Sequence, residues 1–93
     1  MQVTVKFLGA LGKQVGAGSI PVDVPDGGTY RDLLEAIGPM VQAKLDAWAW
    51  DADRQMFSRR MLISRNGVSE LRDGSTALAD GDEIVVVLPL AGG

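Results

Sequence analysis

The sequence predicts an α+β domain in which helical segments pack across one face of a small sheet. Apolar and polar residues alternate over residues 2–8, and residues 84–88 are rich in β-branched side chains, so both stretches predict strands. Between them, apolar side chains recur at the spacing of one helix face: Tyr30, Leu33, Leu34 and Ile37. A chain of 93 residues has room for one such domain.

Composition excludes several classes of function. The chain contains neither cysteine nor histidine, which removes thiolate and imidazole catalysts, Cys/His zinc sites and disulfides. Nine Lys and Arg against 12 Asp and Glu give a net charge of −3, so we expect no nucleic-acid partner. Apolar runs are far shorter than the roughly 20 residues of a membrane helix, and the amino terminus lacks a signal-peptide pattern. We therefore expect no membrane contact and a cytoplasmic location.

The first third of the chain predicts two strands joined by a loop. The alternation over residues 2–8 predicts a strand with one buried face. Residues 9–18 hold four glycines, and we interpret them as a loose hairpin loop. Residues 20–24 alternate again, and Pro21 places this second strand at a sheet edge, because proline cannot donate to a strand pair.

The middle of the chain predicts helix. The hydroxyl of Thr29 can cap a helix start, and Asp32 is favourable in the first turn. Gly38 and Pro39 are expected to end or kink this helix. We interpret residues 50–60 as a connection pinned by its aromatic side chains. A second short helix is expected after Pro39, from apolar residues at helical spacing: Val41, Leu45 and Trp48.

The last third predicts the rest of the sheet. Residues 61–65 predict a short strand that turns at Asn66-Gly67, a dipeptide that tolerates positive φ, and the chain returns over residues 68–71. A further turn at residues 80–82 leads into residues 84–88, the most strongly β-branched run, which we place centrally beside the first strand.

This final strand is apolar on both of its faces. We expect Ile84, Val86 and Leu88 to face the helix, which leaves the alternate positions on the outside. The outer apolar set, which we expect to dock partner proteins, comprises Leu62, Val85 and Val87.

Motifs that would bring ligand chemistry are incomplete. The Gly12-Lys13 pair lacks both the following Ser or Thr and the first glycine of a phosphate loop. Asp51 begins a segment resembling a calcium loop, but Met56 replaces the required glycine. The acidic residues at 80–83 are interpreted as turn formers, so no metal site is predicted.

Beyond the last predicted strand the sequence reads Pro89-Leu90-Ala91-Gly92-Gly93. We expect residues 1–88 to form the domain and residues 89–93 to project as a flexible tail. Because glycine has no Cβ, the last two residues allow a terminal carboxylate to be threaded through a narrow channel into another protein's active site. Carboxylate is a poor electrophile, so its use in acyl transfer requires activation by ATP.

The order of elements resembles the β-grasp fold of ubiquitin-like proteins. The segment LADGDEI at 78–84 and the ending LPLAGG at 88–93 resemble the sulfur-carrier branch of these proteins, most closely the small subunit of molybdopterin synthase. The Asn66-Gly67 turn also matches, and the added segment at 48–59 is typical of the longer bacterial and archaeal members. The resemblance implies a ubiquitin-like β-grasp with a mixed sheet of four to five strands, one main helix and a short second helix.

The resemblance also implies a role for the tail. Gly93 would be adenylated by a ubiquitin-activating-type adenylyltransferase that uses ATP and Mg, converted to a thiocarboxylate, and used to donate sulfur. The implied pathway is biosynthesis of molybdopterin, the molybdenum or tungsten cofactor. The chain would serve as a non-catalytic subunit without a permanently bound cofactor, beside a synthase large subunit or another sulfur-accepting enzyme. The segment threaded into the partner would be Pro89, Leu90, Ala91 and Gly92.

Three other functions are compatible with this sequence; two use Gly93 in the same way, and one requires only the fold. A ubiquitin-like modifier would be conjugated to lysines through Gly93, and a carrier for cysteine, thiamine or siderophore synthesis would pass its sulfur to a different acceptor. Both share their activation chemistry with the molybdopterin carrier. A third hypothesis is a β-grasp interaction module whose tail has no role.

Overall fold

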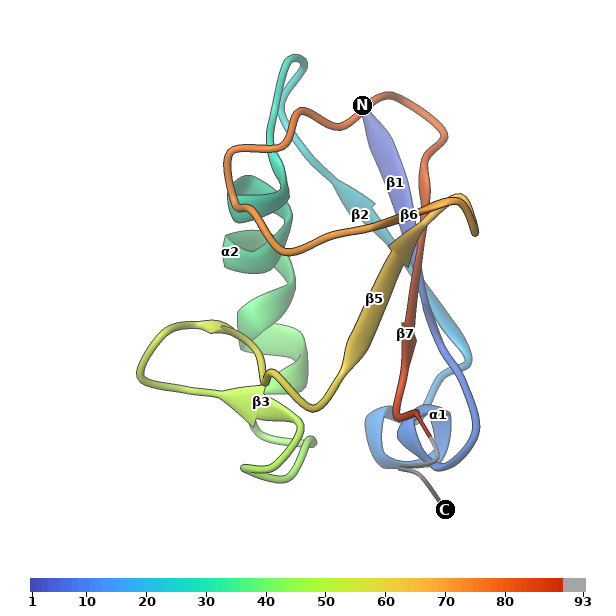
Figure 1. Ribbon diagram of the computed structural model, residues 1–93, viewed down its shortest axis with the longest axis vertical. Coiled ribbons are helices and arrows are strands. Elements are labelled where there is room, and N and C mark those ends of the chain that lie inside the picture. Colours follow the sequence, from blue (N-terminus) through green and yellow to red (C-terminus); the bar gives the residue numbers. More distant parts are fainter. Residues whose placement is uncertain (90–93) are drawn as a thin grey trace.

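The computed structural model describes residues 1–89, which form a mixed five-stranded sheet crossed on one face by a long helix (Figure 1). The strand order is β2-β1-β7-β5-β6. Its strands are β1 (Gln2–Phe7), β2 (Ser19–Asp23), β5 (Leu62–Arg65), β6 (Ser69–Glu70) and β7 (Glu83–Val87). The helices are α1 (Ala10–Val15) and α2 (Tyr30–Val41), and a separate hairpin pairs β3 (Trp50–Asp51) with β4 (Met56–Phe57).

Strand β7 is central, as the sequence predicts. It runs parallel to β1, with Val5 beside Ile84, and antiparallel to β5, with Ile63 beside Val86. β2 lies at the edge, where Pro21 pairs in register with Thr4 of β1. The predicted α+β fold with a mixed sheet is therefore confirmed.

The core lies between the inner face of this sheet and α2. The inward residues of β1 and β7 are at most 3% exposed, and so are the inward residues of the helix. Alternate residues on the strands remain partly exposed, which is the pattern of a sheet with one covered face. The helical half of the core comprises Tyr30, Leu33, Leu34, Ile37 and Val41.

Helix α2 begins as predicted but ends differently. Thr29 and Asp32 form a reciprocal capping box: the Thr29 hydroxyl accepts from the Asp32 N–H, and the Asp32 carboxylate accepts from the Thr29 N–H at 2.9 Å. Pro39 lies inside the helix, which continues to Val41. The loss of one N–H in the last turn is tolerated there, so the helix does not end at Gly38-Pro39, and the prediction of a second helix after Pro39 is wrong. Residues 42–49 form hydrogen-bonded turns that bury Leu45.

The short second helix is α1, within the stretch predicted to be a loose loop, and this part of the prediction is also wrong. Leu11 and Val15 lie one turn apart and are each 2% exposed, so α1 buries one face. Gly9 and Gly16 bound it with φ of 61° and 85°, where glycine is favoured. Two of the four glycines therefore bound a helix instead of loosening a loop.

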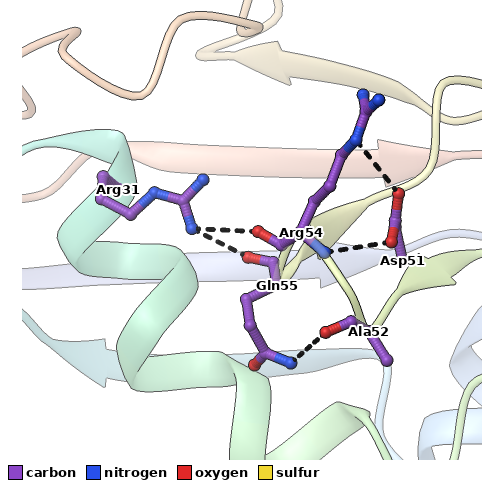
Figure 2. A network of polar contacts seen from close by, with 5 residues as sticks. All are labelled: Arg31, Asp51, Ala52, Arg54 and Gln55. Carbon is purple, nitrogen blue, oxygen red and sulfur yellow. Dashed lines mark hydrogen bonds and ion pairs between the residues drawn. The ribbon is translucent and has the colours of Figure 1, made fainter.

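Residues 50–60 are pinned by aromatic side chains, as predicted, and in addition form the β3–β4 hairpin. Trp50 and Phe57 pack edge to face, with ring centroids 5.1 Å apart. Figure 2 shows how α2 holds the tip of the hairpin: the Arg31 guanidinium donates to the carbonyl of Gln55 at 3.0 Å. Gln55 itself has a φ of 54°, and its side-chain amide donates to the carbonyl of Ala52 at 2.6 Å.

Within residues 1–89, no helix combines the length and apolar character needed to cross a bilayer.

Candidate functional site

The candidate site is the outer face of the sheet where β7 ends. Leu88 and Pro89 follow β7 and are exposed, so the chain leaves the domain between β1 and β5. The tail residues predicted to act in chemistry and threading, residues 90–93 with Gly93 at the end, lie outside the described residues. Their roles stay predictions.

The three residues predicted to form the outer apolar set share one face. Leu62 lies directly opposite Val87 in the β5–β7 pairing, and Val85 is two positions earlier on β7. Their neighbours Ile63 and Val86 are buried on the inner face, which places this set on the outside. Leu62 is 39% exposed, and the two valines are half-buried.

Leu88 was expected to face the helix, and that expectation is wrong. β7 ends at Val87, so Leu88 lies past the last paired residue and is 41% exposed. A strand position one residue beyond the ladder has no neighbour to hold it against the core.

Leu8 is a further apolar residue at this end of the sheet, and the sequence analysis missed it. Its N–H donates to the carbonyl of Val86 at 3.1 Å, and its side chain is 47% exposed. The signal for Leu8 in the sequence was an apolar residue directly after Phe7, where the alternation over residues 2–8 calls for a polar one. We name Leu8, Leu62, Val87 and Leu88 the tail-root patch, because they lie around the end of β7, after which the predicted tail follows in the sequence.

The other half of the outer face is polar. Lys6 of β1 and Glu83 of β7 form an ion pair at 3.1 Å with both side chains about half exposed. Such an exposed pair contributes little to stability. It keeps the start of β7 hydrated, so the apolar surface is confined to the end where the tail leaves.

The acidic turn before β7 is structural, as interpreted from the sequence. Asp82 is 6% exposed, and its carboxylate accepts hydrogen bonds from the Ala79 N–H at 2.8 Å and the Asn66 amide at 3.0 Å. Burial acts to raise the pKa of Asp82, but these hydrogen bonds and the Arg65 charge outweigh it, so the pKa lies below its usual value. Within the part of the chain that the structure describes, no group of three or more acidic residues is placed to hold a metal ion.

Comparison with known proteins decides the family. The sequence matches the ThiS family over residues 5–93. The chain belongs to the ThiS family. Proteins of this kind are ubiquitin-like β-grasp sulfur carriers, which is the family that the sequence resemblance indicated. No match was found among curated protein sequences.

Solved structures agree with this ThiS-family assignment. Small archaeal modifier protein 1 (SAMP1) from Haloferax volcanii is 26% identical, with full coverage of both chains and a TM-score of 0.80. A putative molybdopterin converting factor subunit 1 from Pyrococcus furiosus is 24% identical over 97% of this chain and 99% of that one, with a TM-score of 0.69. A complex of subunits 1 and 2 of molybdopterin-converting factor from Helicobacter pylori contains a chain that is 22% identical with full coverage of both and a TM-score of 0.60.

The function follows at the level of the family. This ThiS-family chain is a ubiquitin-like sulfur carrier or modifier, a class of small proteins that are generally not catalytic. Among the described residues, the exposed apolar side chains of Leu8, Leu62 and Leu88 lie near the end of β7.

Proposed function

We propose that this ThiS-family chain carries sulfur as a thiocarboxylate on Gly93 and donates it in molybdopterin biosynthesis. The observation that carries the proposal is the family match, which runs through the Gly-Gly ending to residue 93. β7 ends at Val87, so residues 88–93 follow the domain and, fully extended, span at most about 20 Å. That reach is enough to bring a terminal carboxylate into the active site of a docked partner.

The chemistry has two steps that balance. A Gly93 carboxylate oxygen attacks the α-phosphorus of ATP and releases pyrophosphate, which leaves an acyl adenylate. Hydrosulfide (HS−) then attacks the acyl carbon, the bond from that carbon to the AMP oxygen breaks so that AMP leaves, and the thioacid loses one proton to become the thiocarboxylate. In this proposal the activating enzyme binds ATP and Mg and supplies the acid–base groups, and this chain supplies the Gly93 carboxylate.

Glycine is suited to this position for a steric reason. Adenylation needs the carboxylate oxygen in line with the α-phosphorus, and a misplacement of about 1 Å can cost on the order of a hundredfold in rate. A chain without Cβ atoms at Gly92 and Gly93 fits a narrow channel that holds this alignment. Pro89, Leu90 and Ala91 would form the rest of the threaded segment.

The partners would dock on the outer face of the sheet. Leu62, Val85 and Val87 form its apolar part together with Leu8, and they lie at the base of the tail. Docking there would hold the tail at a fixed distance from the partner's active site. The partners are a ubiquitin-activating-type adenylyltransferase and, after sulfur transfer, a synthase large subunit.

Mass spectrometry of the intact chain tests the proposal. After incubation with ATP, Mg, the activating enzyme and a sulfide source, we expect a mass gain equal to the exchange of one oxygen for one sulfur. Fragmentation should place the gain on the C-terminal peptide. The chain lacking Gly93 is the matched control and should gain nothing. An unmodified parent chain, together with normal cofactor synthesis in cells that carry only the Gly93 deletion, would contradict the carrier function.

The molybdopterin pathway needs its own test. The length match to the Pyrococcus furiosus protein, which covers 97% of this chain and 99% of that one, supports this choice over a shorter carrier. The thiocarboxylate form, mixed with a synthase large subunit and the pterin precursor, should yield the dithiolene product. Transfer only to an acceptor in cysteine, thiamine or siderophore synthesis would reassign the pathway and leave the carrier chemistry intact.

A modifier function is the second candidate, and it is favoured by the likeness to SAMP1 at 26% identity with full coverage of both chains. The same acyl adenylate would then be attacked by a lysine amine, which forms an isopeptide bond and releases AMP. Conjugates of higher mass that vanish with the Gly93 deletion would support it. Their absence, with thiocarboxylate present, would favour the carrier.

A further inference from the structure

A pocket of about 350 Å³ lies between the β3–β4 hairpin, the start of α2 and the β5–β6 edge. Ile63 lines it from the inner face of β5, whereas Leu62 of the tail-root patch points to the outer face. The pocket is thus separate from the surface assigned to sulfur transfer. Its apolar floor consists of side chains that are each at most 5% exposed: Tyr30, Phe57, Met61, Ile63 and Leu71.

The rim of this pocket is cationic. Arg54, Arg59 and Arg72 line it against a single carboxylate, that of Asp51. Three of the nine basic residues of a chain with net charge −3 therefore gather at one pocket. This concentration makes the pocket an attractive site for negative charge.

These cations are available to a ligand. The Arg54 side chain is 61% exposed and lies 3.8 Å from Asp51, and the Arg72 side chain is 64% exposed and pairs with Glu70. Exposed pairs of this kind contribute little and exchange readily for a better partner. Arg59 makes no ion pair with any residue from 1 to 89.

The hairpin that carries Arg54 is held in place before any ligand arrives. Figure 2 shows the Arg31 guanidinium donating to two successive carbonyls at the hairpin tip, those of Arg54 and Gln55. The Asp51 carboxylate accepts from the Arg54 N–H at 3.1 Å. The backbone that carries Arg54 therefore loses little conformational entropy on binding, which favours recognition.

We propose that this pocket docks a partner-protein segment in which one large apolar side chain is flanked by carboxylates. The floor can bury a single aromatic or aliphatic anchor, because its volume is at the low end of the roughly 300–1,000 Å³ of ligand pockets. The guanidinium groups lie in solvent around that anchor. They can therefore pair with carboxylates on the partner's surface, and not with a charge inside the pocket. An apolar centre within a charged rim is the anatomy of a protein docking site.

A blocked pentapeptide tests this inference, with phenylalanine between two pairs of acidic residues and both ends neutralised. In two-dimensional NMR of the full chain, it should cause saturable shifts at the Ile63 and Leu71 amides. Replacing two of the three rim arginines in the Arg59→Gln/Arg72→Gln variant should weaken binding by about tenfold or more. The Lys6→Gln variant removes a cation from the outer face instead and should bind the peptide unchanged.

Three results would overturn the proposal. They are the absence of saturable shifts, equal binding of a peptide with lysines in place of the acids, and equally tight binding of 3-phenylpropionate, which would make this a site for a small organic anion. The measurement uses neither the activating enzyme nor Gly93. The chain lacking Gly93 should therefore bind the peptide like the parent, so failure of this inference and failure of the carrier function are distinguishable.

Discussion

The guanidinium of Arg65 contacts the carboxylate of Asp82 with Nε and Oδ2 2.8 Å apart, and this contact joins the end of β5 to the turn before β7. Asn66 strengthens the junction, because its amide donates to Asp82 while its carbonyl oxygen accepts from the Glu83 N–H at 2.8 Å. The strand from which the tail extends is therefore fixed at its start by side chains from the neighbouring strand's turn.

Because of this junction, the free energy of unfolding should decrease at acidic pH. The pKa of Asp82 is lowered in the folded chain, so its contribution is present above the unfolded value of about 3.9 and is lost as pH falls through the folded pKa. At neutral pH, Asp82→Asn should lower the free energy of unfolding by about 1–3 kcal/mol, because a charged acceptor is removed from buried donors. Urea unfolding of parent and variant should show this gap narrowing below about pH 4.

The exposed Asp53 provides the control for this prediction. Asp53→Asn changes the same charge by the same amount on the exposed hairpin, so it should leave stability within about 0.5 kcal/mol of the parent. A gap between parent and Asp82→Asn that stays constant from neutral pH to pH 3 would show that the ionised carboxylate is not the stabilising form.

Gly28 is predicted to be required for steric reasons. A Cβ at this position would lie 2.5 Å from Val24 Cγ1 and 2.7 Å from the Pro25 carbonyl oxygen, which also accepts the Gly28 N–H at 2.8 Å. Gly28→Ala should therefore lower the free energy of unfolding by about 1–3 kcal/mol. Gly18→Ala is the control, since no atom lies within 4 Å of its added Cβ. Equal stability of the two variants in urea unfolding would contradict the steric argument.

Leu34 should be among the residues on which folding depends most. Its side chain is fully buried on the inner face of α2. Leu34→Ala should cost about 2–5 kcal/mol through lost burial and the cavity left behind. That is a large fraction of the 5–15 kcal/mol typical of a domain. Glu35→Ala, at the next and exposed position, should stay within about 0.5 kcal/mol, and an unchanged thermal midpoint for Leu34→Ala would mean that the helix buries a different face.

The elements predicted correctly from the sequence are those set by local chemistry. The Thr29 helix cap, with Asp32 in the first turn, and the Asn66-Gly67 turn, with φ of 54° and 70°, depend on residues within one turn of each other. β7 could be predicted from the sequence because its β-branched residues favour a buried strand at any position in a sheet. Such signals survive in a single sequence.

The elements that were missed depend on packing against other elements of the fold. In α1, a Cβ at Gly12 would lie 3.0 Å from the Phe7 carbonyl oxygen, so glycine there allows close packing against the end of β1 instead of flexibility. The β3–β4 hairpin has strands of two residues each and is held by Arg31, more than 20 positions earlier. Leu8 was missed for a similar reason, since only its hydrogen bond to Val86 places it beside the end of β7.

The final prediction concerns the tail-root patch. If partners dock there, a charge at Leu62 or Val87 must be buried without a counter-charge when the complex forms, which is costly. Leu62→Asp or Val87→Asp should weaken binding of the activating enzyme by about 1–3 kcal/mol and slow thiocarboxylate formation in proportion. Isothermal titration calorimetry and the rate of the mass gain measure the two effects.

Val68 supplies the matched control for the patch. It is also apolar and is 88% exposed, but it follows the Asn66-Gly67 turn at the opposite end of β5 from Leu62. Val68→Asp therefore makes the same change of charge as Leu62→Asp at a site outside the tail-root patch. The Val68→Asp variant should bind the activating enzyme like the parent chain. If Val68→Asp weakens binding as much as Leu62→Asp does, net charge explains the loss. If neither patch variant weakens it, the partner engages the tail without resting on the end of β7.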